Sequence, residues 1–344
     1  MPSKPSIRDI AKSCGVAPST VSRVLNNRAG EVGEETRQRI LDAMRRMNYR
    51  PAQMHHAPVD KTYTLGIISG ISSSSYYVEG YFHSLVDSLL AVISEHRHNG
   101  LIFASHIFHE APHQSIRAYC DGKCDGLMVL APGIGSPLIS SIQERGFPLA
   151  VIGVSGEDSS VACCDLDNTH AVCIAMDEFL GMGHRQIALC QGPPRLQPTE
   201  IRRSAYLDAL SSAGIPVDEQ FISPMSADPQ TLGEWVRSML RELEVERRPT
   251  AILCFNDTHA GYVLDALRSI EARVPEDISL IGIDDSGSAH FEPPLTTVGQ
   301  PYREISVCAI ESVLSQIAGD GNIPQSALLQ GQLIRRRSVA PPHP

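Results

Sequence analysis

The sequence predicts an α/β protein in which a small all-α N-terminal segment precedes two doubly wound parallel-sheet subdomains. Charge is the first indication, because residues 1–57 contain ten Lys and Arg against five Asp and Glu, whereas the whole chain of 344 residues has a formal net charge of -10. From residue 64 onward, short apolar runs alternate with longer amphipathic segments, as strands alternate with helices. The apolar runs are nearly continuous, which indicates parallel strands covered by helices on both faces.

The composition excludes several protein classes. With 42% hydrophobic and 20% charged residues, it is that of an ordinary globular protein. No apolar run approaches the ~20 residues that a membrane-spanning helix needs, and the N-terminus lacks the apolar core of a signal peptide. Nine cysteines follow no metal or disulfide framework, which indicates reduced thiols. We therefore expect a cytoplasmic protein that has no membrane contact and needs no metal or cofactor.

Three helices fit residues 6–48. Ser6 is suited to cap the first helix, with Asp9 completing a capping box, and Gly15 is suited to its C-terminal end. Pro18 fits the first position of a second helix, which runs to about residue 26. Two short helices joined by a tight turn have helix-turn-helix geometry, so the segment is predicted to be a helix-turn-helix headpiece.

The second helix carries side chains that suit DNA. Hydroxyl groups and a guanidinium reach phosphates and base edges, and they are expected on its exposed side at Ser19, Thr20, Ser22 and Arg23. Subtracting residues 1–57 from the chain leaves 19 basic and 34 acidic residues, which repel phosphate. Only the first segment is therefore a credible nucleic-acid surface. A purely structural helical bundle with a solvated polar face is the alternative.

The rest of the chain is predicted to alternate strands with helices. Strands are expected over 64–69, 100–105, 125–131, 149–154, 161–167, 186–192, 251–256, 279–285 and 295–300. Helices are expected over 81–95, 136–146, 170–183, 200–214, 231–243, 259–271 and 303–319. Nine strands over about 280 residues fit two doubly wound sheets better than one.

Four stretches of the N-terminal segment form a pattern, namely Ile7-Arg-Asp-Ile-Ala-Lys with Gly15-Val16, Ser19-Thr-Val-Ser-Arg-Val-Leu-Asn-Asn27, Glu34-Glu-Thr-Arg and Asn48-Tyr-Arg-Pro51. Together they resemble the headpiece of the LacI/GalR family of bacterial transcription regulators. The resemblance implies binding to double-stranded operator DNA. It places Pro18, Ser19 and Arg23 where the family reads bases in the major groove. It places a second set at backbone-anchoring positions, namely Ser6, Ile7, Thr20, Ser22, Asn26 and Tyr49.

The headpiece departs from the family pattern in two places. Ala17 stands where a serine is usual, which removes a helix cap worth ~1 kcal/mol. The family's hinge segment is here Ala52-Gln-Met-His-His-Ala-Pro58, one residue shorter, with Pro58 at or near the position of the leucine that wedges into the minor groove. Met54 is the only large apolar side chain that remains as a wedge. Either the hinge no longer inserts in the usual way, or Pro58 simply ends a short hinge helix.

Further motifs follow in the family's order, namely Asp165-Leu-Asp-Asn168, Gly183-His-Arg-Gln-Ile-Ala188, Arg202-Arg-Ser-Ala-Tyr206, Asn256-Asp257, Val274-Pro-Glu-Asp-Ile-Ser279, Gly282-Ile-Asp-Asp285 and Pro294-Leu-Thr-Thr297. They resemble the family's periplasmic-binding-protein type I core, two Rossmann-like subdomains around a ligand cleft. The implied organisation is a headpiece with hinge over 1–57, a linker over 58–63 and an effector-binding core over 64–344. Within the core, the N-subdomain covers about 64–164 and 299–327, and the C-subdomain about 165–296 and 328–344.

Six residues are the candidates for binding the effector. Arg202 offers a fork of donors, Asn256 donates and accepts, and Asp284 accepts from paired hydroxyls. Such an array suits a carbohydrate, although the family also senses nucleobases and nucleosides. The alternative for Asn256 or Asp284 is a helix cap. Aromatic candidates for stacking on a sugar face, with core packing as the alternative for the first two, are Tyr81, Phe82 and Tyr302.

The resemblance implies an effector-responsive transcription regulator, most simply a repressor that binds a pseudo-palindromic operator as a homodimer. No nucleophile–base pair or cofactor fingerprint is recognisable, so no catalytic residue is expected and the chain is predicted not to be an enzyme. Two alternatives remain open. One is a ligand sensor whose altered hinge has weakened its DNA binding. The other is a solute-binding protein, which predicts a secretion signal and no headpiece.

Overall fold

The structure, a computed structural model, describes residues 6–25, 32–47, 61–69, 79–103, 116, 118–154, 161–319 and 327–343. The chain divides into two compact units, Met1–Asp60 and Lys61–Pro344. Asn26, Tyr49, Met54 and the hinge over 52–58 lie outside the described residues. The boundaries predicted for the headpiece, the linker and the two subdomains stay a prediction. In the part of the chain that the structure describes, no helix combines the length and apolar character needed to cross a membrane.

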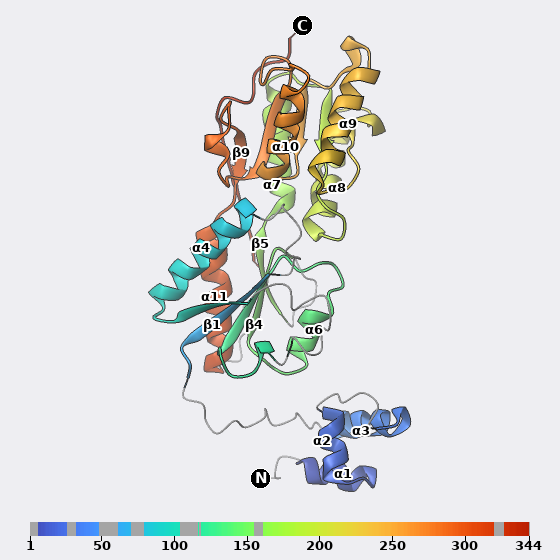
Figure 1. The fold of residues 1–344 in the computed structure, drawn as a ribbon, viewed down its shortest axis with the longest axis vertical. Coiled ribbons are helices and arrows are strands. Elements are labelled where there is room, and N and C mark those ends of the chain that lie inside the picture. Colours follow the sequence, from blue (N-terminus) through green and yellow to red (C-terminus); the bar gives the residue numbers. More distant parts are fainter. Residues whose placement is uncertain are drawn as a thin grey trace. The chain divides into compact units, whose positions relative to one another are not determined.

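The first unit contains three helices, α1 (Ile7–Cys14), α2 (Pro18–Leu25) and α3 (Glu34–Arg46) (Figure 1). All three contribute buried side chains to one small core, because their apolar residues recur at helical spacing. The members of this core are Ile10, Ala11, Cys14, Val21, Val24, Ile40 and Ala43. The predicted three-helix headpiece is confirmed.

The predicted ends of α1 and the start of α2 are also confirmed. Ser6 Oγ accepts from the Asp9 amide at 3.3 Å, and the Asp9 carboxylate accepts from the Ser6 amide at 2.7 Å, which completes the capping box. Gly15 follows α1 with a φ of 62°, in the left-handed region that favours glycine at helix C-termini. Pro18 begins α2, where no intrahelical hydrogen bond is lost.

The second unit is built on two sheets. The first sheet has the strand order β10-β5-β4-β3-β1-β2, and all of its pairs are parallel. Its strands are β1 (Thr64–Ser69), β2 (Asn99–Phe103), β3 (Gly126–Leu130), β4 (Leu149–Ile152), β5 (Ala162–Leu166) and β10 (Ala327–Leu329). In its register, Leu65 is paired with Gly126 and Ile152 with Cys164.

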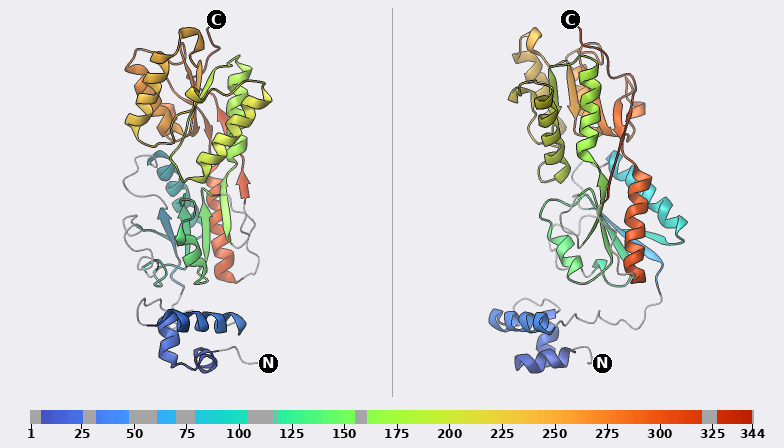
Figure 2. Two further views of the ribbon diagram at one scale, coloured as in Figure 1. Left: turned by 90° about the vertical axis from the view of Figure 1, so that its right-hand side faces the viewer. Right: turned by 180° about the vertical axis from the view of Figure 1, so that it is seen from behind.

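Helices cover both faces of the first sheet. In the right-hand view of Figure 2, α11 (Tyr302–Ala318) and α4 (Glu79–Glu95) lie on one side of the sheet and α6 (Pro137–Gln143) lies on the other. Alternate strand residues enter separate cores, so that Ile67 packs on the α4 and α11 side and Ile68 on the opposite side. Burial on both faces is the reason why the strands read as continuous apolar runs.

The second sheet has the order β11-β9-β8-β7-β6 and is parallel except for β11, which pairs antiparallel with β9. Its strands are β6 (Ile187–Cys190), β7 (Ala251–Cys254), β8 (Ser279–Asp284), β9 (Thr296–Gly299) and β11 (Gln332–Ile334). One core contains residues of α7 (Asn168–Gly181) and α8 (Gln197–Ser212), and the other contains residues of α9 (Pro229–Glu242) and α10 (Asp257–Arg268). Short 3-10 turns span Glu219–Phe221, Val245–Arg247 and Ser288–His290.

The predicted pair of doubly wound sheets is confirmed, with two additions. The strands β10 and β11 were not expected, and β11 departs from the parallel arrangement. Within the described residues, the chain passes between the sheets three times, from β5 to α7, from β9 to α11 and from β10 to β11. The first two passages begin at carboxyl ends of parallel strands, where doubly wound sheets bind ligands.

Asp125 fixes the residues that lead into β1. Thr62 donates to Asp125 Oδ1 through its amide at 3.0 Å and through Oγ1 at 2.9 Å. The Tyr63 amide donates to Asp125 Oδ2 at 2.9 Å. Because Asp125 directly precedes β3, which pairs with β1, the C-terminal end of the predicted linker is held to the first sheet.

Replacing Asp125 by asparagine is expected to loosen this end of the linker. An asparagine has one acceptor oxygen instead of two, so one of the two backbone amides loses its partner. We expect hydrogen exchange at Thr62 or Tyr63 to become about tenfold faster, since a hydrogen bond to a charged group is worth about 1.5 kcal/mol or more. Exchange mass spectrometry measures this. Asp121→Asn, an exposed aspartate of the same loop, is the control, and unchanged exchange in D125N would show that the carboxylate does not hold the linker.

Candidate functional sites

The helix α2 presents its predicted DNA-reading side chains away from the headpiece core. Val21 and Val24 are buried on the opposite side of the helix. The exposed or half-buried residues are Pro18, Ser19, Thr20, Ser22 and Arg23. This face is arranged as a DNA-reading helix requires, and contact with DNA through these residues stays a prediction.

Ser6 and Ile7 already serve the fold of the headpiece. The Ser6 hydroxyl donates to Asp9 Oδ2 at 2.6 Å, in addition to its capping bond. Ile7 is half-buried and packs against the headpiece core. Both residues therefore shape the start of α1, and their predicted contact with the DNA backbone stays a prediction.

Polar side chains gather at the carboxyl ends of strands in the second unit. Asp165 is the penultimate residue of β5, and Asn168 begins α7. Asn256 follows β7, Asp284 ends β8 and Gln300 follows β9, while α8 contributes Arg202. We call this group the polar cluster, and its members are Asp165, Asn168, Arg202, Asn256, Asp284 and Gln300.

Arg202 is the cation of the polar cluster. It is 6% exposed, its Nε donates to Asn168 Oδ1 at 2.8 Å, and one of its terminal nitrogens donates to the Phe255 carbonyl. Its guanidinium carbon lies 4.7 Å from the centroid of the Phe255 ring. Burial lowers the pKa of Arg202, and the nearby carboxyls of Asp284 and Asp165 oppose that shift.

Asp284 and Asn256 are coupled to each other. The Asp284 carboxylate accepts from Gln300 Nε2 at 2.6 Å and from the Asn256 side chain. Asn256 Oδ1 accepts from the His259 amide at 2.9 Å, at the N-terminus of α10. The helix-capping alternative is thus confirmed for Asn256, which also orients Asp284. Asp284 itself caps no helix, because the turn that follows β8 begins after Gly287.

Burial changes the acidity of the carboxyl groups in this region. Burial raises the pKa of Asp165 to about 6 and that of Asp284 to about 6. The neighbouring Asp257 has its pKa raised to about 7, also chiefly by burial. Near neutral pH, the polar cluster therefore contains one cation and carboxyl groups that are close to their titration range.

Three buried polar atoms, one within the polar cluster and two beside it, have no hydrogen-bond partner among the described residues. They are Ser286 Oγ, Gln300 Oε1 and the Tyr302 hydroxyl. The loop after β8 closely approaches the start of α4, since a Cβ on Gly80 would lie 2.6 Å from Ser286 Oγ. Buried polar atoms normally have partners, and hydroxyl groups of a small molecule would supply them.

Two of the predicted aromatic residues border the polar cluster. The rings of Tyr81 and Tyr302 are 6.0 Å apart at an interplanar angle of 49°. Burial, with the charges of Asp165 and Asp284, raises the pKa of Tyr81, because its hydroxyl lies among these groups. Tyr81 and Phe82 both pack against the core of the first sheet, which is the alternative role that the sequence suggested for them. Stacking on a ligand stays a prediction for all three aromatic residues.

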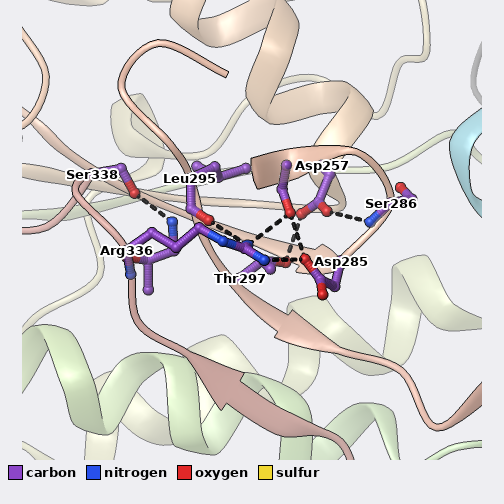
Figure 3. A network of polar contacts seen from close by, with 9 residues as sticks. Asp257, Asp285, Ser286, Leu295, Thr297, Arg336 and Ser338 are labelled. Carbon is purple, nitrogen blue, oxygen red and sulfur yellow. Dashed lines mark hydrogen bonds and ion pairs between the residues drawn. The ribbon is translucent and has the colours of Figure 1, made fainter. Parts of the chain in front are cut away.

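A second polar network fixes the loop after β8 (Figure 3). Asp257 Oδ2 accepts from the Ser286 amide at 2.8 Å, and Asp257 Oδ1 accepts from Thr297 Oγ1 at 2.6 Å. Arg336 forms an ion pair with Asp285 at 2.6 Å, with the Arg336 side chain only 17% exposed. These contacts join the start of α10, the strand β9 and the C-terminal segment to the loop, which holds the end of β8 in place.

Sequence reasoning found part of the polar cluster and missed part of it. The structure brings together Arg202, Asn256 and Asp284, as expected. Asp165 and Asn168 were identified only as a motif, and Gln300 was not singled out, although it follows a strand end as Asn256 does. That any member binds an effector stays a prediction. Among the described residues, no group of three or more His, Cys, Asp or Glu is arranged to hold a metal ion.

Comparison with known proteins gives two family matches. Residues 6–52 match the family model described as bacterial regulatory proteins, lacI family, and residues 176–339 match the model of a periplasmic binding protein-like domain. Together the two matches cover more than half of the chain. This places a regulator headpiece and a ligand-binding fold in one polypeptide.

The chain also aligns with known proteins over most of its length. The chain is 29% identical to the HTH-type transcriptional repressor PurR of Erwinia tasmaniensis and 28% identical to that of Escherichia coli O1:K1 / APEC, with 97% of each chain covered. Among solved structures, a transcriptional regulator CelR–cellobiose complex matches with a TM-score of 0.73 and 26% identity, over 97% of this chain and 99% of the other. A regulatory protein of the LacI family from Chloroflexus aggregans matches with a TM-score of 0.71 and 25% identity, over 81% and 99%.

Proposed function

We propose a function for this chain that starts from its membership of the lacI family of bacterial regulatory proteins. The polar cluster binds a small neutral carbohydrate. The bound carbohydrate changes the affinity of a dimeric repressor for operator DNA. At the coarser level, the chain is an effector-responsive DNA-binding transcription regulator. The observation that carries the finer proposal is the polar cluster itself, with its paired donors and acceptors and the unpartnered atoms beside it.

The functional groups of the polar cluster suit hydroxyl groups. Each hydroxyl of a sugar both donates and accepts a hydrogen bond. The carboxylates of Asp284 and Asp165 accept hydrogen bonds, and the guanidinium of Arg202 donates them. The unpartnered Gln300 Oε1 is a further acceptor, and the unpartnered Tyr302 hydroxyl can donate or accept. The bordering aromatic rings offer an apolar surface for the face of a sugar ring. A carbohydrate would therefore satisfy groups that are otherwise buried without partners.

The charge of the polar cluster favours a neutral ligand over a phosphorylated one. Its single guanidinium, Arg202, already donates to Asn168 and to a backbone carbonyl. Two carboxyl groups, Asp165 and Asp284, lie close to it. An added anion would face two carboxylates of its own sign and only one engaged cation, at a cost that burial increases. The regulator solved in complex with cellobiose, a neutral disaccharide, supports the same ligand class.

The DNA-binding form is proposed to be a homodimer in the cytoplasm, where a regulator meets the bacterial chromosome. Two headpieces would read the half-sites of a pseudo-palindromic operator, as helix-turn-helix dimers do. Pro18, Ser19 and Arg23 are proposed to read bases, and Ser6, Ile7, Thr20, Ser22, Asn26 and Tyr49 to anchor the DNA backbone, with Met54 as a wedge in the minor groove. The relatives named as transcriptional repressors support repression.

A thermal-shift screen tests the ligand class. The full-length protein is heated with neutral mono- and disaccharides, with their phosphorylated forms and with nucleosides. A ligand present at about 100 times its Kd stabilises the folded protein by about 2.7 kcal/mol, so a true effector is readily detected. We expect a shift with a neutral sugar and none with its phosphate. A shift with nucleosides alone would overturn the carbohydrate proposal and leave the regulator assignment intact.

A further inference from the structure

Two cysteines of the second unit lie in contact. Cys164 is on β5, and Cys308 is on α11, which packs on the same face of the first sheet. Their sulfur atoms are 2.6 Å apart. A disulfide bond is about 2.05 Å long, so a shift of roughly half an ångström would bring the two sulfurs to bonding distance.

We propose that Cys164 and Cys308 form a reversible disulfide when the protein meets a hydroperoxide. The polypeptide would thus carry an oxidation site in addition to its effector site. In the reducing cytoplasm that the proposed function implies, disulfides are transient and serve redox sensing rather than stability.

The two thiols differ in the way that such a reaction requires. Cys164 is 1% exposed, whereas Cys308 is half-buried, so an oxidant reaches Cys308 first. The Cys164 thiol donates a hydrogen bond to the Cys308 sulfur, which lowers the pKa of Cys308, while the same contact and burial raise the pKa of Cys164. An accessible thiol of lowered pKa beside a resolving thiol is the usual arrangement of a redox-sensing pair.

The reaction balances with one hydroperoxide per disulfide. The Cys308 thiolate attacks one peroxide oxygen, the O–O bond breaks, and after protonation water or an alcohol leaves and a sulfenic acid remains on Cys308. The Cys164 sulfur then attacks the sulfenic sulfur. Its proton leaves with the displaced hydroxide as one molecule of water. Both thiols are oxidised by two electrons in total, and the peroxide is reduced.

The other cysteines near this site are placed differently. Cys163, the neighbour of Cys164, points to the opposite face of the sheet and belongs to another core. Cys190 and Cys254 pair across β6 and β7, but both are 0% exposed, so an oxidant does not reach them in the folded protein. Cys173 is exposed on α7, and burial with nearby aspartates raises its pKa. Among these cysteines, the Cys164–Cys308 pair combines contact between thiols with access.

The bond would join two elements that also form the polar cluster and its border. Asp165 directly follows Cys164 on β5. The helix α11 that carries Cys308 begins at Tyr302. A covalent link at this place therefore acts on the same two elements that frame the proposed effector site.

Thiol counting and peptide mapping of the full-length protein test the proposal. Reduced protein is treated with hydrogen peroxide, the remaining thiols are alkylated, and the digest is analysed by mass spectrometry. We expect two of the nine thiols to be lost and the peptides of Cys164 and Cys308 to appear linked. A dithiol reductant should restore all nine thiols.

Three variants complete the test. Cys308→Ser should lose the linked peptide, and Cys164→Ser should leave Cys308 as a sulfenic acid that dimedone traps. Cys173→Ser, the control at an exposed thiol, should still form the link. If Cys164→Ser fails to fold, Cys308→Ser alone tests for the disulfide. Cys308 is only half-buried, so its replacement by serine is expected to leave the fold intact. Retention of nine thiols, a link between other cysteines, or a link that forms only in denaturant would overturn the proposal.

Discussion

Replacing Arg202 by methionine is expected to destabilise the second unit by about 3–5 kcal/mol, the usual effect of removing one partner from a buried charge network. Arg202 is 6% exposed and provides the positive charge beside Asp165 and Asp284. Its loss leaves two buried carboxyl groups without a counter-charge and Asn168 without the donor at 2.8 Å. Effector binding should be lost as well, because the guanidinium is the cation of the polar cluster.

Denaturant titration and the thermal-shift assay measure the two effects separately. Arg202→Lys keeps the charge without the planar fork, so it should retain part of the stability and lose most of the effector affinity. Arg203→Met, at the next position of α8, is the control, since that residue is half-buried and outside the polar cluster. If R202M were as stable as R203M, the assignment of Arg202 as the buried counter-charge would be wrong.

Mild acid is expected to stabilise the protein between about pH 7 and pH 5. Burial raises the pKa of Asp165 and Asp284 to about 6 and that of Asp257 to about 7, from an ordinary value of 3.8. In this range the native state binds more protons than the unfolded state, so the free energy of unfolding falls as pH rises. His259 and His184 act in the opposite direction, because burial lowers the pKa of both, that of His259 to about 4. Three carboxyl groups outweigh two imidazoles.

The variant Asp284→Asn isolates one part of this dependence. A shift of about two pKa units corresponds to roughly 2–3 kcal/mol, which the asparagine removes from the pH dependence of unfolding. Denaturant titrations at pH 5, 6 and 7 would therefore show a shallower slope for D284N than for the natural chain. Asp265→Asn, whose side chain is 76% exposed, should leave the slope unchanged. A loss of stability of the natural chain on acidification from pH 7 to pH 5 would show that these carboxyl groups do not have raised pKa values.

The long strands were predictable, and the short ones were not. Strands such as β3 and β7 are buried at every position, so their sequences are continuous apolar runs. The strands β10 and β11 have three residues each and no fully buried position. The partner of β10, β5, lies more than a hundred positions earlier in the chain, and the partner of β11, β9, lies more than thirty positions earlier. No local sequence pattern indicates a contact over such a separation.

The polar cluster was predictable where a residue type suggested chemistry at a strand end. Asp284 and Asn256 were found in this way, and the cap of Asn256 on α10 was among the alternatives, but the hydrogen bond between the two side chains was not visible in the sequence. Gln300 was missed because a single glutamine after a strand has many ordinary roles. Its importance arises only from the fold, which places its Nε2 2.6 Å from Asp284. The effect of the short hinge over 52–58 stays a prediction.

Fluorescence anisotropy with a labelled operator duplex from its own promoter measures whether this chain reads DNA under the control of a small molecule. We expect binding that weakens steeply with salt, as phosphate contacts require, and that changes at least fivefold when the effector is added. Arg23→Ala should weaken binding by about tenfold or more and relax the base preference. Arg39→Ala removes an equal, exposed charge from α3 and should keep that preference. Binding that ignores salt, survives Arg23→Ala unchanged and does not respond to the effector would show that the headpiece does not read DNA under effector control.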